Sequence, residues 1–394
     1  MKNPRSNSHF KMKRENELKV LNLLRENEFL SRVDLTHQTH LDAKTITNLI
    51  RSLMKSGFVK TAGFNPPSGG RPAQKLQLNP DDLYIGLDLG ATHIAGVITN
   101  SKGSINNSKN IEISADEEKD SIIQKILEIL DFLLTDIQHK RVIGIGFASP
   151  GIIDRQNGIS VYAANLSNWQ NVPIRQILQG KFGIPVLMED CSRTMGLAEK
   201  VFGCCKDVDN FILMDLGFGI GCAIFNNGVL HTGATFDAGE IGHTIVNSSG
   251  KICRCGKRGC LEAIVSGFAI SKEYEQRASP ARVFDVKEIS GLAAGGDVVA
   301  QDIIKESGKY IGIATANLIN LLNPEIIVFA GGLTKIGDLL LQSIYSAINE
   351  YAYQDSLKAV EFKNSVLGDY GGALGADALV MDKVFEFSCL EGKR

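Results

Sequence analysis

The chain has 394 residues, which is too long for one ordinary domain, so two or three folding units are expected. Hydrophobic residues make up 44% of it and charged residues 22%, a composition typical of a soluble globular protein. No apolar stretch approaches the roughly 20 residues that span a bilayer, and the basic N-terminus lacks the apolar segment of a secretory signal. We therefore expect a cytoplasmic protein with no membrane partner.

Charge is distributed unevenly along the chain. Residues 1–80 hold 14 Lys and Arg against 6 Asp and Glu, a net charge of +8. Because the whole chain carries −2, the remainder carries −10. A basic head on an acidic body favours a polyanionic partner for the head, although basic arms also occur as solubilising tails.

Residues 1–80 show the order of elements of a winged helix-turn-helix. Leucines at helical spacing predict a first helix over 14–26, and Ser31 with Asp34 predicts a capped short helix over about 31–38. Asp42 can cap a third helix, which Gly57 would end. The apolar face of that third helix repeats at helical spacing. It consists of Ile46, Leu49, Ile50 and Leu53.

The opposite face of the third helix is polar and basic. It carries Lys44, Thr45, Thr47, Asn48 and Arg51. Such side chains suit base edges in the major groove; for an isolated helix a solvated face would be the simpler interpretation, but the order of elements favours DNA. Strand-like runs flank a Pro/Gly loop and predict a β-hairpin wing. Arg71 in that loop could enter a minor groove, and an ordinary interdomain linker explains the loop equally well.

The remainder of the chain contains a near-repeat. Residues 84–98 and 211–225 each combine an apolar strand, an Asp-Leu-Gly turn and a second apolar strand. Helical stretches at about 117–138 and 300–322 are each followed by another strand. Two similar α/β halves facing a cleft predict the actin-like ATPase (ribonuclease H-like) fold of sugar kinases. We place the boundaries at 1–80, 81–200 and 201–394, with the last helix packing back on the first α/β half.

A cluster of soft ligands follows in the second half. It comprises His243, Cys253, Cys255 and Cys260. Three thiolates and one imidazole form the closed tetrahedral set of a structural zinc, and intervening glycines allow a tight knuckle. Because four protein ligands leave no open position, zinc-activated water is not expected. A zinc sensor is the alternative for this cluster.

The motif Gly-Glu-Ile-Gly-His at 239–243, followed by Cys-x-Cys-Gly-x-x-Gly-Cys-Leu-Glu, resembles the signature of the ROK family (repressors, open reading frames and sugar kinases). The resemblance runs through most of the chain, and with a winged head it is similar to the xylose-repressor branch. It implies a set of sugar-binding residues. They are Asn165, Asp190, Glu240, His243 and Glu262. The two glutamates could instead support the zinc knuckle.

The resemblance to family kinases is incomplete where phosphate would bind. Asp190 stands at the position of the family's general base, but Phe218 replaces the threonine of a Gly-Thr-Gly loop, and the first loop lacks a glycine and a lysine. We interpret both loops as vestigial and expect little or no kinase activity and no catalytic residue. The vestigial positions are Asp88, Gly90, Thr92, Gly217 and Gly219.

These features predict a sugar-responsive repressor of carbohydrate-utilisation genes. It would bind operator DNA as a homodimer or homotetramer and sense a sugar in a kinase-like cleft. Two alternatives stay open: a bifunctional sugar kinase with a regulatory head, and a regulator controlled by a protein partner.

Overall fold

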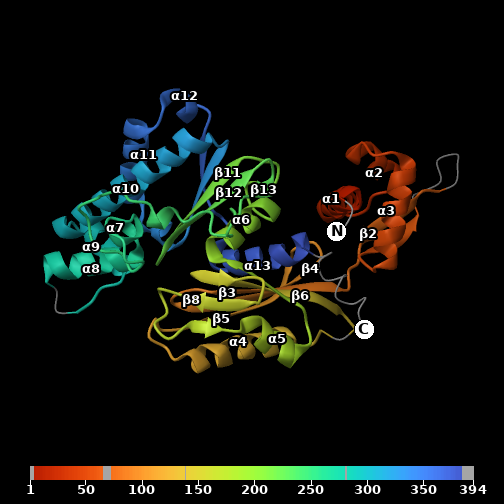
Figure 1. Ribbon diagram of the computed structural model, residues 1–394, viewed down its shortest axis with the longest axis horizontal. Coiled ribbons are helices and arrows are strands. Elements are labelled where there is room, and N and C mark those ends of the chain that lie inside the picture. The colour runs from red at the N-terminus through yellow and green to blue at the C-terminus, as the bar shows by residue number, and fades with distance from the viewer. Residues whose placement is uncertain (1–3, 65–71, 138, 280–281, 384–394) are drawn as a thin grey trace.

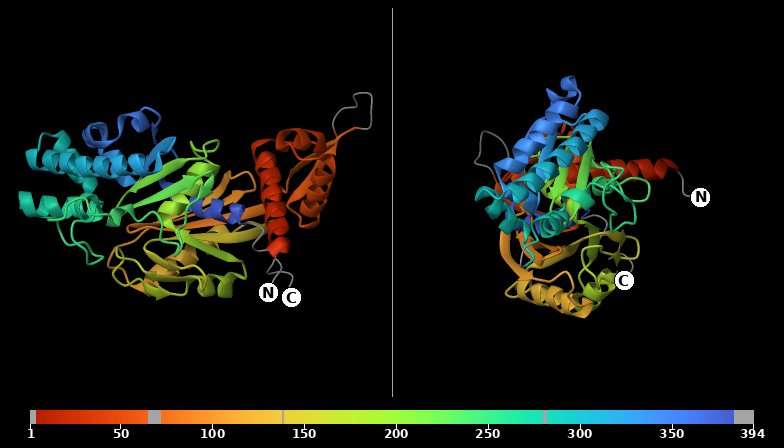
Figure 2. Two further views of the ribbon diagram at one scale, coloured as in Figure 1. Left: turned by 45° about the horizontal axis from the view of Figure 1, so that its top comes forward. Right: turned by 90° about the vertical axis from the view of Figure 1, so that its left-hand side faces the viewer.

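The computed structural model describes residues 4–64, 72–137, 139–279 and 282–383, with side chains from residue 12 onward. A helical head lies at one end of an elongated molecule, and two α/β lobes make up the rest (Figures 1 and 2). Within the described residues, no helix combines the length and apolarity that crossing a membrane requires.

The head contains three helices and a two-stranded hairpin. Ser31 caps the second helix in a full capping box with Asp34, and Asp42 caps the third helix by accepting from the Thr45 amide, both as predicted. The first helix begins ten residues earlier than the leucine pattern indicated. The elements are α1 (Pro4–Glu26), α2 (Arg32–Thr39), α3 (Ala43–Lys55), β1 (Val59–Phe64) and β2 (Gln74–Leu78).

The first lobe is a five-stranded sheet with order β10-β6-β3-β4-β5. The β3 and β4 strands form the antiparallel hairpin of the first repeat, and β6 and β10 continue the sheet in parallel. A small sheet of β7, β8 and β9 lies beside it. The elements are β3 (Asp82–Leu89), β4 (His93–Asn100), β5 (Ile105–Glu112), α4 (Lys119–Leu133), β6 (Arg141–Ser149), β7 (Ile152–Asp154), β8 (Ile159–Tyr162), β9 (Gln170–Val172), α5 (Ile174–Phe182), β10 (Val186–Asp190) and α6 (Cys191–Val201).

The second lobe repeats this order as β15-β14-β11-β12-β13. Its central strand β11 is antiparallel to β12 and parallel to β14, as β3 is to β4 and β6. This duplication confirms the predicted fold class. The regular elements are β11 (Phe211–Leu216), β12 (Ile220–Asn226), β13 (Val229–Leu230), α7 (Glu262–Val265), α8 (Gly267–Ala278), α9 (Val286–Ala294), α10 (Val298–Leu322), β14 (Ile326–Ala330), α11 (Asp338–Tyr351), α12 (Gln354–Leu357), β15 (Glu361–Asn364) and α13 (Gly371–Asp382). Short 3-10 turns span Ile241–His243, Gly332–Ile336 and Gly368–Tyr370.

Helix α13 lies between the first sheet and α6, in the middle of the molecule (Figure 1). Glycines bring its backbone unusually close to its neighbours. A Cβ atom added at Gly86 of β3 or Gly146 of β6 would lie 1.8 Å from a carbonyl oxygen of α13, and one added at Gly375 would lie 1.8 Å from the Thr194 oxygen of α6. Any side chain at these positions would force the elements apart, so α13 is locked against both.

The core of the head continues into the first lobe. Val380 and Met381 at the end of α13 share one buried cluster with α1, α3 and the hairpin of the head, as does Tyr84 of β3. At the edge of this seam, Arg141 pairs with Asp82 and donates to a carbonyl oxygen of the head at Ser56. The head is therefore attached through packed side chains as well as through the chain itself.

Candidate functional site

A cleft of about 980 Å³ opens between the two lobes. Turns from both Asp-Leu-Gly repeats line it, as do the loops that carry the residues assigned to sugar binding by resemblance. Its wall contains all five of them, namely Asn165, Asp190, Glu240, His243 and Glu262. All five vestigial phosphate-loop positions also line this cleft. Asp88, Gly90 and Thr92 come from the first lobe, and Gly217 and Gly219 come from the second.

Asp190 is positioned by the start of a helix. It is the N-cap of α6, and its Oδ1 accepts from the backbone amides of Ser192 (3.0 Å) and Arg193 (3.2 Å). Among the described residues, no hydrogen bond is formed by Oδ2. A carboxylate fixed through one oxygen can offer the other as an acceptor for a hydroxyl hydrogen.

The two glutamates face the cleft from the second lobe. Glu262, at the start of α7, accepts from the Ile220 amide at 3.1 Å. This bond connects it to the loop 217–219, the second phosphate-type loop; the first is the loop 88–93. Burial raises the pKa of Glu240, and the nearby Asp190 raises it further, while His243 opposes the shift. Both carboxylates therefore line the same cleft as Asp190, from the opposite lobe.

The imidazole and the three thiols meet as the spacing predicted. Their ligand atoms all lie within 4.8 Å of one another, so the cluster could hold a metal ion. His243 Nδ1 lies 3.6 Å from Cys253 Sγ, and the Sγ atoms of Cys255 and Cys260 are 3.7 Å apart. A tetrahedral zinc with bonds of about 2.3 Å to sulfur and about 2.0–2.1 Å to nitrogen requires separations of about 3.6 and about 3.8 Å. The donor set and its spacing fit zinc.

His243 has a second nitrogen that faces away from the thiols. Its Nε2 lies 3.9 Å from Glu240 Oε2, on the cleft side. Because one ring nitrogen is directed to the cysteine cluster, the other is left as the group that can meet a ligand in the cleft. The knuckle and the cleft therefore share a residue.

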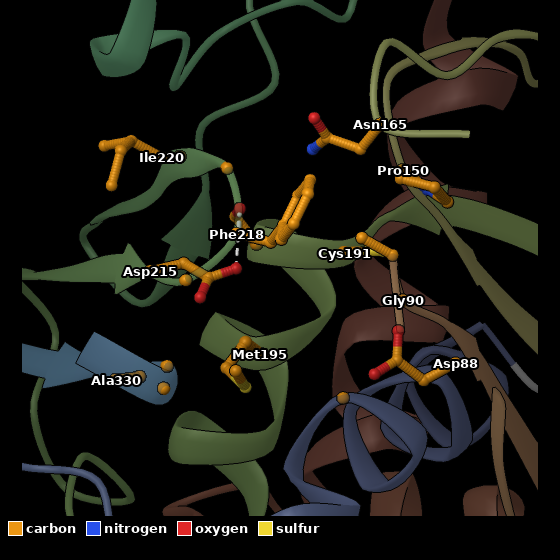
Figure 3. A pocket seen from close by; sticks show the side chains of 18 of the residues that line it. Asp88, Gly90, Pro150, Asn165, Cys191, Met195, Asp215, Phe218, Ile220 and Ala330 are labelled. Carbon is orange, nitrogen blue, oxygen red and sulfur yellow. Dashed lines mark hydrogen bonds between the residues drawn. The ribbon is translucent and has the colours of Figure 1, made fainter. Parts of the chain in front are cut away.

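Phe218 projects from the second phosphate-type loop into the cleft and points toward Asn165 (Figure 3). Its ring lies 5.9 Å from the Phe268 ring. In the first loop, loss of solvent around the half-buried Asp88 raises its pKa, and its Oδ1 forms no hydrogen bond within the described part of the chain. Burial also raises the pKa of Asp215 to about 7. This end of the cleft presents two acids of raised pKa and an aromatic ring.

On α3 the polar residues divide into two groups. Lys44, Asn48 and Arg51 are exposed. The hydroxyls of Thr45 and Thr47 bond locally, to Asp42 at 2.6 Å and to the Ala43 oxygen at 2.7 Å. In the exposed group, Arg51 also donates to Asn48 Oδ1 at 3.2 Å. The remaining DNA-binding candidate, Arg71, lies outside the described residues.

Comparison with known proteins finds a family match for the head and another for the two lobes. A ROK family model matches residues 84–383, and a winged helix-turn-helix DNA-binding model matches residues 13–60. The chain belongs to the ROK family.

The relatives within this family include repressors and kinases. The chain is 30% identical to the xylose repressor of Caldicellulosiruptor bescii over 96% of this chain and 98% of that protein. It is 31% identical to the glucokinase of Thermotoga maritima, over 77% of this chain and 99% of the glucokinase. A crystal structure of a ROK family transcriptional regulator, a homologue of the Escherichia coli MLC protein, superposes with a TM-score of 0.81 at 28% identity, over 96% of this chain and 99% of that one. The repressor relatives match the head as well as the lobes.

Sequence reasoning did not find two arginines that connect the lobes. Arg155 of the first lobe pairs with Glu189 and donates to the Phe236 oxygen of the second lobe, and Arg254 of the knuckle reaches the first lobe. Their partners lie far away in the sequence, and only the fold brings them together. A charged residue between two metal ligands was the one available signal, and it was present at Arg254.

Proposed function

We propose that this chain is a sugar-responsive transcriptional repressor of carbohydrate-utilisation genes that binds operator DNA through α3 and has lost kinase activity. The observation that carries the proposal is the continuity of packing from cleft to head. Asp190, assigned to the sugar, caps α6; α6 is locked to α13 at Gly375; and the end of α13 is buried with the head. A ligand that moves α6 must therefore act on the surface that holds the head.

The first phosphate-type loop also reaches α13. A Cβ atom added at Gly372, in the first turn of α13, would lie 2.1 Å from Asp88 Oδ2. Both ends of the cleft thus contact the helix that supports the head. In a dimeric or tetrameric repressor, a shift of a few ångströms between heads would break the half-site spacing that operator binding requires.

Several departures support the absence of kinase activity. Phosphoryl transfer depends on backbone and side-chain donors around the phosphates and on a cation that neutralises developing charge. Phe218 offers neither, and it fills space between the second loop and Asn165 (Figure 3). A coupled assay with ATP and a panel of sugars tests this directly: we expect no turnover, and sustained formation of ADP with sugar phosphate would establish the bifunctional alternative.

Zinc would be held by His243 and the three cysteines, and when bound it supplies a structural cross-link for the knuckle. The neighbouring residues His243 and Glu262 then hold fixed positions on the cleft wall. A protein that binds operator DNA must be in the compartment that contains the DNA, so we also propose a cytoplasmic location.

The effector is identified by a thermal-shift screen of free and phosphorylated sugars, with xylose first because four similar proteins are named xylose repressors or putative xylose repressors. A ligand that binds only the native state raises its melting temperature. Asp190→Asn is the matched control, since asparagine can still cap α6 but cannot offer a carboxylate to the sugar. A sugar that stabilises wild type but not this variant supports the assignment, whereas a chain that responds to no sugar favours control by a protein partner.

A further inference from the structure

Arg254 occupies an unusual position in the zinc knuckle. It lies between Cys253 and Cys255 in the second lobe, yet its guanidinium group contacts the first lobe. Its Nη1 donates to the Ala164 carbonyl oxygen at 2.7 Å and to Asn165 Oδ1 at 2.6 Å. One side chain of the second lobe therefore holds the loop of the first lobe that carries a sugar-binding residue.

Two aromatic rings support the guanidinium group. Its central carbon lies 3.9 Å from the centroid of the Phe268 ring and 5.9 Å from that of Phe218. The ring quadrupoles attract a guanidinium group that lies over the faces of aromatic rings, and this restricts its movement. The aromatic ring that replaces a phosphate-binding hydroxyl in this chain thus forms part of a shelf for Arg254.

The contact decides how the Asn165 amide is presented. Arginine has only donors, so it must bind the amide oxygen and leave Nδ2 for other partners. In Figure 3 the Asn165 nitrogen points toward Phe218, on the inner side of the cleft. A Cβ atom at Gly219 would lie only 3.0 Å from this nitrogen, which places Nδ2 directly over the second loop. Asn165 therefore offers a donor close to carboxylates of the same cleft, such as Asp190, Glu240 and Glu262.

We propose that Arg254 is a positioning residue for sugar recognition: it latches the two lobes together and fixes Asn165 as the hydrogen-bond donor to a sugar oxygen. The inference rests on the proposed function, because it concerns the same cleft. It also gives the knuckle a role beyond stability, since the metal ligands on either side of Arg254 fix the backbone from which the latch extends. Carboxylates then accept from sugar hydroxyls while Asn165 donates to one of their oxygens.

The test compares two arginines of the same knuckle. Arg254→Met keeps the length and apolar stem of the side chain and removes its donors. Arg258→Met is the matched control, because Arg258 bonds to the Gly250 oxygen within the knuckle and lines no part of the cleft. Zinc content is measured for both variants, and we expect it to equal that of wild type.

Two readouts are measured on the full chain. Hydrogen exchange without any sugar reports the loop that contains Asn165 and Trp169, and sugar affinity is measured by calorimetry with the sugar found in the screen. We expect Arg254→Met to speed exchange in residues 163–169 and to weaken sugar binding roughly tenfold, the loss of a charged hydrogen bond. Arg258→Met should change neither quantity. Arg254→Lys, which keeps the charge and loses the planar fork, should fall between them.

The outcomes separate the latch from the proposed function. Unchanged exchange and unchanged sugar affinity in zinc-loaded Arg254→Met would overturn the inference. Equal losses in Arg254→Met and Arg258→Met would overturn it too, because they would report general damage to the knuckle. If exchange changes but wild type binds no sugar, the latch between the lobes stands and the sugar-sensing role fails.

Discussion

Replacing Gly375 by alanine tests the link between the cleft and the head. The added Cβ atom would lie 1.8 Å from the Thr194 carbonyl oxygen, whereas real Cβ atoms essentially never come closer than 3.0 Å. Helices α6 and α13 would have to separate by about 1.2 Å. Overpacking of this kind costs about 1–3 kcal/mol, and the better helix propensity of alanine returns up to about 1 kcal/mol. We expect a net loss of about 1–2 kcal/mol in the free energy of unfolding.

The matched control is Gly180→Ala in α5. No atom lies within 4 Å of the Cβ position there, so only the propensity gain applies and stability should rise by about 0.5–1 kcal/mol. Urea unfolding measures both changes, and titration of labelled operator DNA measures the sugar response. We expect Gly375→Ala alone to reduce the sugar-induced change in operator affinity. If it unfolds and responds as wild type does, α6 and α13 are not mechanically coupled and the argument for transmission fails.

Three further changes probe the buried acid, the knuckle and the recognition helix. Burial raises the pKa of Asp377 to about 7, against the opposing effects of Thr99 and Arg25, so its contribution to stability is complete below about pH 4 and is lost as the pH rises through 7. The melting temperature of Asp377→Asn should therefore rise relative to that of wild type as the pH increases from 5 to 8. A difference in melting temperature that stays constant over this range would contradict this. Cys260→Ser should lower zinc content, melting temperature and sugar affinity together; a zinc-free variant that binds sugar normally would refute the role of the knuckle. Asn48→Ala should weaken binding to the operator by roughly tenfold while leaving binding to unrelated DNA unchanged, and equal losses on both DNAs would show that Asn48 reads no base.

Local features of this fold could be predicted because their causes are local. The caps at Ser31 and Asp42 depend on side chains within three residues, and the duplicated lobes follow from two copies of one hairpin pattern. The cluster of one histidine and three cysteines was equally visible, since the three cysteines lie within eight residues. The start of α1 was not found, because its first turns lack the apolar spacing that identified the rest.

Contacts between distant segments could not be predicted. Nothing in the sequence near Arg254 indicates Asn165, which lies 89 positions earlier, and nothing near Asp377 indicates Thr99. The hydroxyls of Thr45 and Thr47 were assigned to DNA by their place on a helix face, whereas local bonds to the helix compete for them. Site residues were located through resemblance to a family, and their geometry required the structure.

The central claim is that a sugar in the cleft controls DNA binding without being phosphorylated. The most direct measurement is the affinity of the full chain for operator DNA, titrated with the effector sugar in the absence and presence of ATP, with the sugar recovered for mass spectrometry. We predict a change in operator affinity of roughly 5- to 150-fold that needs no ATP, with the sugar recovered unmodified. An operator affinity that no sugar alters, or a change that appears only as sugar phosphate accumulates, would contradict the account.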